Sequence, residues 1–347
     1  MIESKPQLPI SIHLFTTLCL GWLLAACQAA VTPPAAPANW TATPTVTIAA
    51  TATIPSPSPT VSPTATTTTP AATPTPTASP TPNVIPPFIP AAVDAPYLEE
   101  PPQTVACGGS GSLFRSHFSS DVGGPQRSYH AYLPPCYGLD GRAYPVLYLL
   151  HGSVETDSHW ADLGLARQAD LGLAAGHYPP FIAIMPYNDQ LGNTTSGGDF
   201  SIEGITVNSL VPYVQRTFCA WNSPVGRAIG GISRGGYWAL EIAFRYPDLF
   251  GAVAGHSSHL RLETDAARYN PLATYATADL SNMRIWLDWG EGDFLWAGQE
   301  QLHQSLTAAG ISHEAHVNPG RHSETYWAVH LDDYLTWYTA AWPLDRS

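Results

Sequence analysis

The sequence predicts a single α/β domain in which a mostly parallel central sheet is covered by helices on both faces. Downstream of about residue 140, short apolar runs that end in turn residues alternate with longer helix-like stretches. This alternation is typical of parallel sheets whose strands are buried on both faces. The 347 residues could hold two domains, but roughly the first 90 lack core-forming composition. The remaining stretch of about 250 residues suits one large domain.

The N-terminus is typical of an exported protein. Residues 1–9 are polar, and residues 10–26 form an apolar run that is short for a bilayer span but suits the core of a signal peptide. The run continues into Leu-Ala-Ala-Cys, ending at Cys27. This sequence resembles the lipobox of bacterial lipoproteins, which implies that residues 1–26 are removed and that Cys27 is acylated. An ordinary secretory signal is the alternative. We expect an extracytoplasmic domain that a lipid anchor attaches to the cell membrane.

Residues 27–93 are dominated by Thr, Pro and Ala, with almost no charge. Such a segment cannot bury enough apolar surface to offset its ordering entropy, so we expect a disordered stalk. Frequent proline favours extended polyproline-like structure, which rises ~3.1 Å per residue. The stalk could therefore hold the folded domain, residues 94–347, on the order of 150 Å from a membrane.

The first elements of the domain are expected to form an antiparallel hairpin. Residues 113–135 contain two strand-like stretches around the turn-rich sequence DVGGPQ. Cys107 and Cys136 lie nearly equidistant from this turn, so antiparallel pairing would place them side by side. We expect these two cysteines to form a disulfide bond and Cys219 to be left over, with three free thiols as the alternative.

Strands and helices alternate after the hairpin. The apolar runs that predict buried strands are 144–152, 179–187, 226–233, 250–258 and 283–290, and SHEAHVNP is a further strand-like stretch. The helix-like stretches are 201–218, 234–247, 298–310 and 324–338. Pro247 cannot continue the second of these helices, and Gly310 is a natural stop for the third. In such sheets ligands bind at the carboxyl ends of the strands.

Residues 231–235, GISRG, fit the G-x-S-x-G pattern of a nucleophile elbow. The pattern needs glycine because the serine lies in a tight turn where side chains two residues away on either side would collide. A strand-like stretch precedes Ser233 and a helix-like stretch follows it. The sequence therefore predicts that Ser233 is a nucleophile, and a glycine-rich turn with a capping serine is the alternative.

A serine nucleophile needs a histidine base and a carboxylate that orients it. His322 lies in a loop that follows a strand-like stretch and opens the last helix, so we expect it to be the base. Three carboxylates surround the end of the strand at 283–290. Asp293 follows two glycines and can turn toward the histidine, whereas Asp288 still belongs to the apolar run. We expect Asp293 to be the acid, with Glu291 and Asp288 as alternatives.

Two backbone N–H groups are expected to stabilise the oxyanion of a tetrahedral intermediate. One belongs to Arg234, the residue after the nucleophile. The other belongs to Ser153, in the loop that closes the first buried strand, where Gly152 lets the backbone turn inward.

No cofactor or metal is expected. Two pairs of histidines are spaced three apart, but neither lies on an expected helix and no third ligand follows at a matching spacing. The sequence also lacks a dinucleotide fingerprint and a phosphate-binding loop. With 14 basic and 27 acidic residues and a formal net charge of −13, nucleic acid is not an expected partner, and membrane contact is expected through the anchor alone.

Four motifs in order give the region from about 105 to 342 a family resemblance. They are LYLLHG, AIGGISRGG, LDWGEGD and NPGRHSETYW, the last of which contains Trp327 five residues after the histidine. The region resembles the esterase family of α/β-hydrolases that includes feruloyl and acetylxylan esterases, S-formylglutathione hydrolase, enterochelin esterases and secreted mycolyltransferases. The resemblance implies an α/β-hydrolase fold, a triad of Ser233, His322 and Asp293, and oxyanion amides at Ser153 and Arg234.

The expected function is hydrolysis of carboxylic esters through an acyl-enzyme. The strands leave little room for a large lid, so the cleft is expected to be open and the substrate polar. Feruloyl or acetyl esters, as small molecules or on plant polysaccharide, are the preferred substrates. Two rivals are an esterase for a siderophore or lactone, and a non-catalytic binding protein on a hydrolase fold.

Overall fold

The computed structural model describes residues 109–139, 141–261 and 266–343. The expected signal peptide, Cys27, the stalk and Cys107 lie outside these residues. Among the helices within them, none combines the length and the apolar character needed to cross a membrane.

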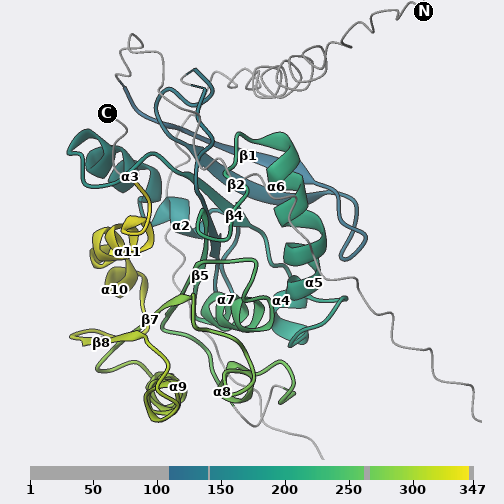
Figure 1. Ribbon diagram of the computed structural model, residues 1–347, viewed down its shortest axis with the longest axis vertical. Coiled ribbons are helices and arrows are strands. Elements are labelled where there is room, and N and C mark those ends of the chain that lie inside the picture. The colour runs from purple at the N-terminus through teal and green to yellow at the C-terminus, as the bar shows by residue number, and fades with distance from the viewer. Residues whose placement is uncertain (1–108, 140, 262–265, 344–347) are drawn as a thin grey trace, which may run out of the picture. The chain divides into compact units, whose positions relative to one another are not determined.

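An eight-stranded sheet forms the centre of the described domain (Figure 1), in the order β1-β2-β4-β3-β5-β6-β7-β8. The strands are β1 (Ser112–Phe118), β2 (Arg127–Leu133), β3 (Val146–Leu150), β4 (Ile182–Pro186), β5 (Arg227–Ile232), β6 (Ala252–His256), β7 (Arg284–Gly290) and β8 (Glu314–Asn318). Strands β3 to β8 pair parallel with one another, whereas β2 pairs antiparallel with both β1 and β4. The predicted mostly parallel α/β architecture is confirmed.

Eleven helical segments are described around the sheet. They are α2 (His159–Asp162), α3 (Leu165–Ala174), α4 (Leu191–Thr194), α5 (Ile202–Ile205), the π-helix η1 (Thr206–Leu210), α6 (Val211–Thr217), α7 (Arg234–Arg245), α8 (Pro271–Thr274), α9 (Trp296–Ala308), α10 (Glu324–Val329) and α11 (Leu331–Thr339). The expected helix at 201–218 is thus divided into α5, η1 and α6. Helix α7 ends two residues before Pro247, and α9 ends two residues before Gly310, whose φ of +68° few other residues adopt.

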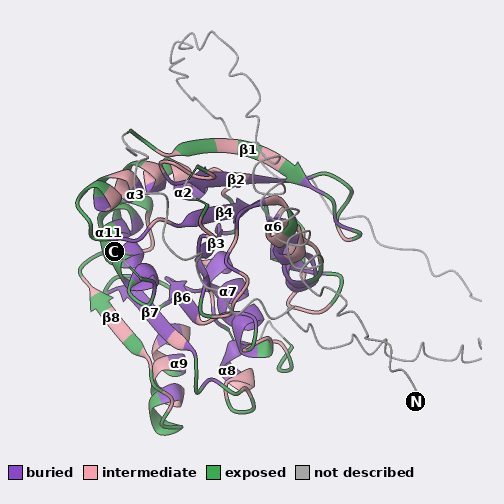
Figure 2. Cartoon of the chain, turned by 45° about the horizontal axis from the view of Figure 1, so that its top comes forward, coloured by how far each residue is buried: buried purple, intermediate pink, exposed green. Residues whose placement is uncertain are grey.

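The sheet separates two apolar cores, because side chains alternate between its faces along each strand. In β3, Tyr148 packs into the core that also contains residues of α6, α7 and α9, whereas its neighbours Leu147 and Leu149 pack into the core with residues of α2, α3 and α11. Figure 2 shows the inner strands buried, while the edge strands β1 and β8 carry exposed residues. Helices therefore cover both faces, and the carboxyl ends of β3, β5, β6, β7 and β8 lie at one edge of the sheet.

The cysteines pair differently from the expectation. Cys136 and Cys219 are both disulfide-bonded, so the expectation that Cys219 is left over is wrong. The Cys219 N–H donates to the hydroxyl of Tyr137 at 2.7 Å, and Tyr137 is the residue next to Cys136. This contact brings the two cysteine segments close together. After β2 the chain turns at Cys136, with φ of +62°, toward the segment that follows α6. Hairpin spacing contains no information about that distant neighbour.

We therefore predict a Cys136–Cys219 bridge in place of the expected Cys107–Cys136 bridge. Peptide mapping of the unreduced protein is expected to recover one cross-linked pair that contains these two residues. Recovery of Cys107 linked to Cys136 would contradict this pairing.

Candidate active site

Ser233 lies in the turn between β5 and α7, at the edge of the sheet where the parallel strands end. Its φ of +57° and ψ of −117° are strained for a residue with a side chain. The turn depends on close backbone approaches. A Cβ on Gly231 would lie 2.2 Å from the backbone of Gly235, and one on Gly235 would lie 2.2 Å from the Leu150 carbonyl oxygen. The Ser233 N–H donates to the His256 carbonyl at 2.9 Å, which anchors the turn to β6.

The structure brings His322 between Ser233 and Asp293. Its Nε2 lies 3.0 Å from the Ser233 Oγ, and its Nδ1 lies 3.1 Å from both carboxylate oxygens of Asp293. The Asp293 carboxylate is fully buried, and the His322 ring is 12% exposed. Since an aspartate oxygen only accepts, the Nδ1 carries the proton that it donates to Asp293, which leaves the Nε2 lone pair facing the serine hydroxyl.

Backbone contacts between two loops hold Asp293 beside His322. The loop after β7 carries Asp293 and the loop after β8 carries His322. The Gly292 N–H donates to the Gly320 carbonyl at 2.8 Å, and a Cβ on Gly290 would lie 2.6 Å from the backbone of Gly320. Asp293 is fixed further because its Oδ1 accepts from the Leu295 N–H at 2.7 Å. Glycine at these crossings lets the two loops touch through their backbones.

The other two carboxylates considered for the acid lie elsewhere. Glu291 is exposed. Asp288 is buried within β7, where its oxygens accept from the side chains of His256, Trp286, Tyr326 and Tyr334 at 2.5 to 2.9 Å. Burial acts to raise the pKa of Asp288, but the neighbouring His256 and these hydrogen bonds hold it below the ordinary value. Asp288 thus organises a buried polar network beneath the site.

The loop that carries Ser153 and the first turn of α7 flank Ser233. Ser153 lines the same cavity as Ser233 and His322, and a Cβ on Gly152 would lie 3.5 Å from the Ser233 Cβ. The Ser153 carbonyl accepts from the Asn193 side chain at 2.7 Å, which ties this loop to α4. Arg234 begins α7, so its backbone amide belongs to the first turn of that helix, next to Ser233.

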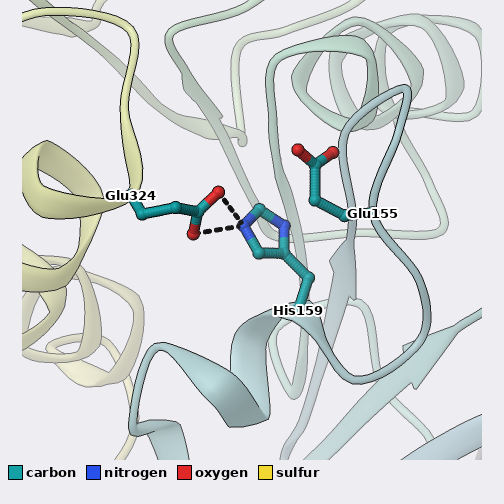
Figure 3. Close-up of side chains that lie close together, drawn as sticks. All are labelled: Glu155, His159 and Glu324. Carbon is teal, nitrogen blue, oxygen red and sulfur yellow. Dashed lines mark hydrogen bonds and ion pairs between the residues drawn. The ribbon is translucent and has the colours of Figure 1, made fainter. Parts of the chain in front are cut away.

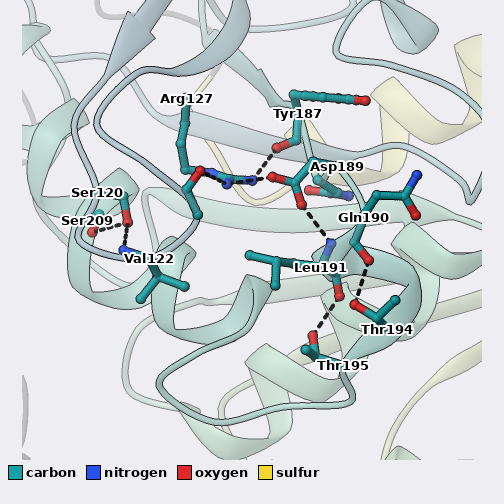
Figure 4. Close-up of polar contacts among 12 residues, drawn as sticks. Ser120, Val122, Arg127, Tyr187, Asp189, Gln190, Leu191, Thr194, Thr195 and Ser209 are labelled. Atoms are coloured by element: carbon teal, nitrogen blue, oxygen red, sulfur yellow. Dashed lines mark hydrogen bonds and ion pairs between the residues drawn. The ribbon is translucent and has the colours of Figure 1, made fainter.

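The segment around α4 contacts both the Ser153 loop and the Arg234 side chain. Figure 4 shows Asp189 accepting from the Arg127 guanidinium at 2.8 Å and from the Leu191 N–H at 2.7 Å, which fixes the start of α4. The Arg234 side chain then donates to the carbonyls of Gly192 and Thr195. Arg234 therefore serves the site through its side chain as well, a structural role that the sequence motif does not reveal.

The cavity over Ser233 has a volume of about 520 Å³. Phe294 and Trp327 line it and flank the His322 ring, with ring centroids 4.7 Å and 5.0 Å away. Phe294 is 71% exposed, although it follows the buried Asp293 directly. Sequence reasoning assigned no role to Phe294, and the only signal for it was an aromatic residue next to the expected acid. The lining offers aromatic surface to an acyl group or an alcohol.

His151 holds the Ser153 loop from beneath as a buried, neutral imidazole. Its Nε2 accepts from the Asn188 N–H at 2.9 Å, so its Nδ1 carries the proton and donates to the Gly152 carbonyl at 2.7 Å. Burial lowers the pKa of His151 to about 4. A proton on Nε2 would remove the acceptor for Asn188, which explains why the folded state disfavours protonation.

Acid is therefore expected to destabilise the fold through His151. Because its pKa is lower in the folded chain, the unfolded chain binds the extra proton first, and stability falls as the pH drops from about 6.5 toward 4. Between pH 7.5 and 4.5 the wild type is expected to lose about 2–3 kcal/mol more than His151→Gln, which cannot titrate. Urea unfolding of both proteins at the two pH values measures the difference. Equal losses would contradict this role.

Residues 120–338 match the family described as "Putative esterase". The chain belongs to this esterase family. Among curated relatives, an esterase of Mycobacterium tuberculosis is 28% identical to this chain over 257 residues, and the match covers 60% of this chain and 55% of the relative. It is 32% identical over 150 residues to an endo-1,4-beta-xylanase/feruloyl esterase of Xylanibacter ruminicola, covering 41% and 21%. The chain thus spans about half, or less, of the length of these relatives.

Solved structures of similar fold include other hydrolases. A ferulic acid esterase superposes with a TM-score of 0.61 at 23% identity, and the superposition covers 67% of the present chain and 98% of the ferulic acid esterase. The S-formylglutathione hydrolase of Staphylococcus aureus superposes with a TM-score of 0.59 at 17% identity, covering 67% and 100%. At these identities the likeness concerns the fold, and it agrees with the predicted α/β-hydrolase architecture.

Proposed function

We propose that the protein is a serine hydrolase of carboxylic esters. The hydrogen-bonded chain from Ser233 through His322 to Asp293 carries the proposal, because it joins a nucleophile, a base and an orienting acid in one line. Membership of the esterase family supports it independently. A binding protein on an inactive hydrolase fold is the contrasting function, and it would not require this chain of contacts.

The proposed reaction proceeds through an acyl-enzyme. The Ser233 Oγ attacks the ester carbonyl carbon while the His322 Nε2 takes the hydroxyl proton. The resulting tetrahedral oxyanion accepts hydrogen bonds from the backbone N–H groups of Ser153 and Arg234, each contributing about 3 kcal/mol. Collapse breaks the bond to the alkoxide, which leaves with the proton from His322, and water then releases the acid by the same steps in reverse order. Asp293 stabilises the imidazolium throughout.

Polar esters with an aromatic or acetyl acyl group, free or attached to polysaccharide, are the proposed substrates. The open cavity, with the exposed Phe294 beside His322, supports this class because an aromatic acid can stack there. The relative from Xylanibacter ruminicola, named in part as a feruloyl esterase, supports it as well.

A substrate panel tests the proposal. Methyl ferulate, an acetylated xylan fragment, a short aryl acetate and a macrocyclic trilactone would be given to the purified chain, with Ser233→Ala as the control. Serine-dependent turnover that is highest on feruloyl or acetyl esters is expected. Highest turnover on the trilactone would move the substrate to the siderophore class, and no serine-dependent turnover on any ester would overturn the hydrolase function.

The proposed location is the outer side of a cell membrane, with acylated Cys27 as the anchor and residues 27–93 as the spacer. Cys27→Ser is expected to move the protein from the membrane fraction to the soluble fraction after cell lysis. A variant that stays with the membrane would contradict the lipid anchor.

A further inference from the structure

A second group of glutamate and histidine side chains lies beside the cavity over Ser233, which is called the catalytic cavity below. Ligand atoms of Glu155, His159 and Glu324 all lie within 4.8 Å of one another. Figure 3 shows the His159 imidazole between the two carboxylates, which come from the loop after β3 and from the start of α10. The three residues line a second, neighbouring cavity of about 580 Å³. None of them belongs to the Ser233–His322–Asp293 chain.

The surroundings of His159 favour a ligand from outside the chain. Its side chain is only 3% exposed, and its Nε2 lies 2.9 Å and 3.2 Å from the two oxygens of Glu324. Its Nδ1 is buried and has no hydrogen-bond partner among the described residues. A buried ring nitrogen without a partner is costly, because it has lost its hydrogen bond to water. Trp327 contacts the ring edge-on at 5.8 Å and limits how far the imidazole can turn.

We propose that Glu155, His159 and Glu324 bind a divalent transition-metal ion of the zinc class. Two carboxylates and one imidazole supply three ligands, and water would complete the coordination, as in open zinc sites. The imidazole ligand favours zinc over Mg²⁺ and Ca²⁺, which prefer oxygen ligands alone. Two carboxylates held near each other repel, and a cation between them removes that repulsion.

The position of this site gives the cation an effect on the cleft. Glu155 and Glu324 line the catalytic cavity as well as the second cavity. Glu324 follows His322 by two residues, and Glu155 follows Ser153 by two, so one ion would link the loop that carries the base to the loop beside the nucleophile. It would also neutralise the two negative charges that Glu155 and Glu324 place on one wall of the cleft.

Zinc binding to the full chain, purified in detergent and stripped with a chelator, tests the site. Titration calorimetry with Zn²⁺ alone is expected to show one saturable site in the wild type. Glu155→Gln and Glu324→Gln preserve shape and remove charge, and each is expected to weaken binding at least about tenfold. Asp162→Asn, an exposed carboxylate of the same cavity wall, is the matched control and is expected to leave the dissociation constant unchanged.

Two further measurements separate this site from other histidines. The His303 Nδ1 and the His313 Nε2 lie 2.8 Å apart, which makes this pair the alternative place for zinc. Because the observed binding is assigned to His159, His303→Gln is expected to leave it unchanged. Cobalt(II) in place of zinc is expected to give visible absorption that His159→Gln abolishes. If the wild type shows no saturable binding, or if Glu324→Gln binds as tightly as the wild type, the proposal is overturned. Glu324 is 58% exposed, so its variant is expected to fold.

Discussion

Ser233→Ala is expected to lower kcat for ester hydrolysis by about 10⁴- to 10⁶-fold while the fold is retained. The hydroxyl is the only group removed, and it is the atom that His322 contacts at 3.0 Å. The backbone bonds of the turn remain, since they run from the Ser233 N–H to His256 and from the His259 N–H to the Ser233 carbonyl. Kinetics on the best ester, with thermal unfolding of both proteins, measures both parts.

Non-additivity provides a sharper form of this test. His322→Ala is expected to cost about as much as Ser233→Ala, and the double variant is expected to be little worse than either one, because the two groups act as a unit. Independent factors that multiply would show that they do not work together. Retention of more than about a tenth of kcat in Ser233→Ala would identify a different nucleophile.

Asp293→Asn is expected to lower kcat by about 10³- to 10⁴-fold with little change in KM. The asparagine amide can donate to the His322 Nδ1, which would move the imidazole proton to Nε2 and leave no lone pair for the serine hydroxyl. Asp293 also accepts from the Leu295 N–H, and the asparagine oxygen can keep that bond. The loss should therefore appear in turnover more than in stability.

Asp288→Asn is the matched control, since it makes the same change to a buried carboxylate five residues earlier. Asp288 accepts from four side chains, and an amide nitrogen in its place would face donors. We expect a loss of about 2–4 kcal/mol in the free energy of unfolding, with a fall in kcat of less than about tenfold. If Asp288→Asn reduced turnover as strongly as Asp293→Asn, the assignment of the acid would be wrong.

Local sequence signals were enough to predict much of the fold and to select most residues of the candidate site. Each apolar run with terminal turn residues contains a strand, because burial on both faces of a parallel sheet leaves that pattern. The glycines around Ser233 indicate a tight turn by their spacing alone, since the close backbone approaches of such a turn leave no room for side chains there. The loop position of Asp293 separated it from Asp288 for a similar reason, because a residue within a strand cannot turn toward a neighbouring loop.

Features that depend on distant neighbours could not be predicted in this way. The bonded state of Cys219 depends on where the chain goes after β2, which hairpin symmetry does not contain. The contact between His159 and Glu324 joins residues 165 positions apart, and neither residue lies in a motif that suggests the other. The support of the Ser153 loop by Asn193 is likewise a tertiary contact between two polar segments.

The glycine-to-glycine crossing between the loops after β7 and β8 has a consequence for how substrate preference can diverge. Since Gly292 and Gly320 join these loops through backbone atoms, the contact between the two loop backbones does not use the side chains that face the cavity. Phe294 could be exchanged for smaller or polar residues without moving the acid that precedes it. Directed evolution of acyl preference is therefore best focused on Phe294 and Val154, both exposed on the cavity wall, with the two glycines left unchanged.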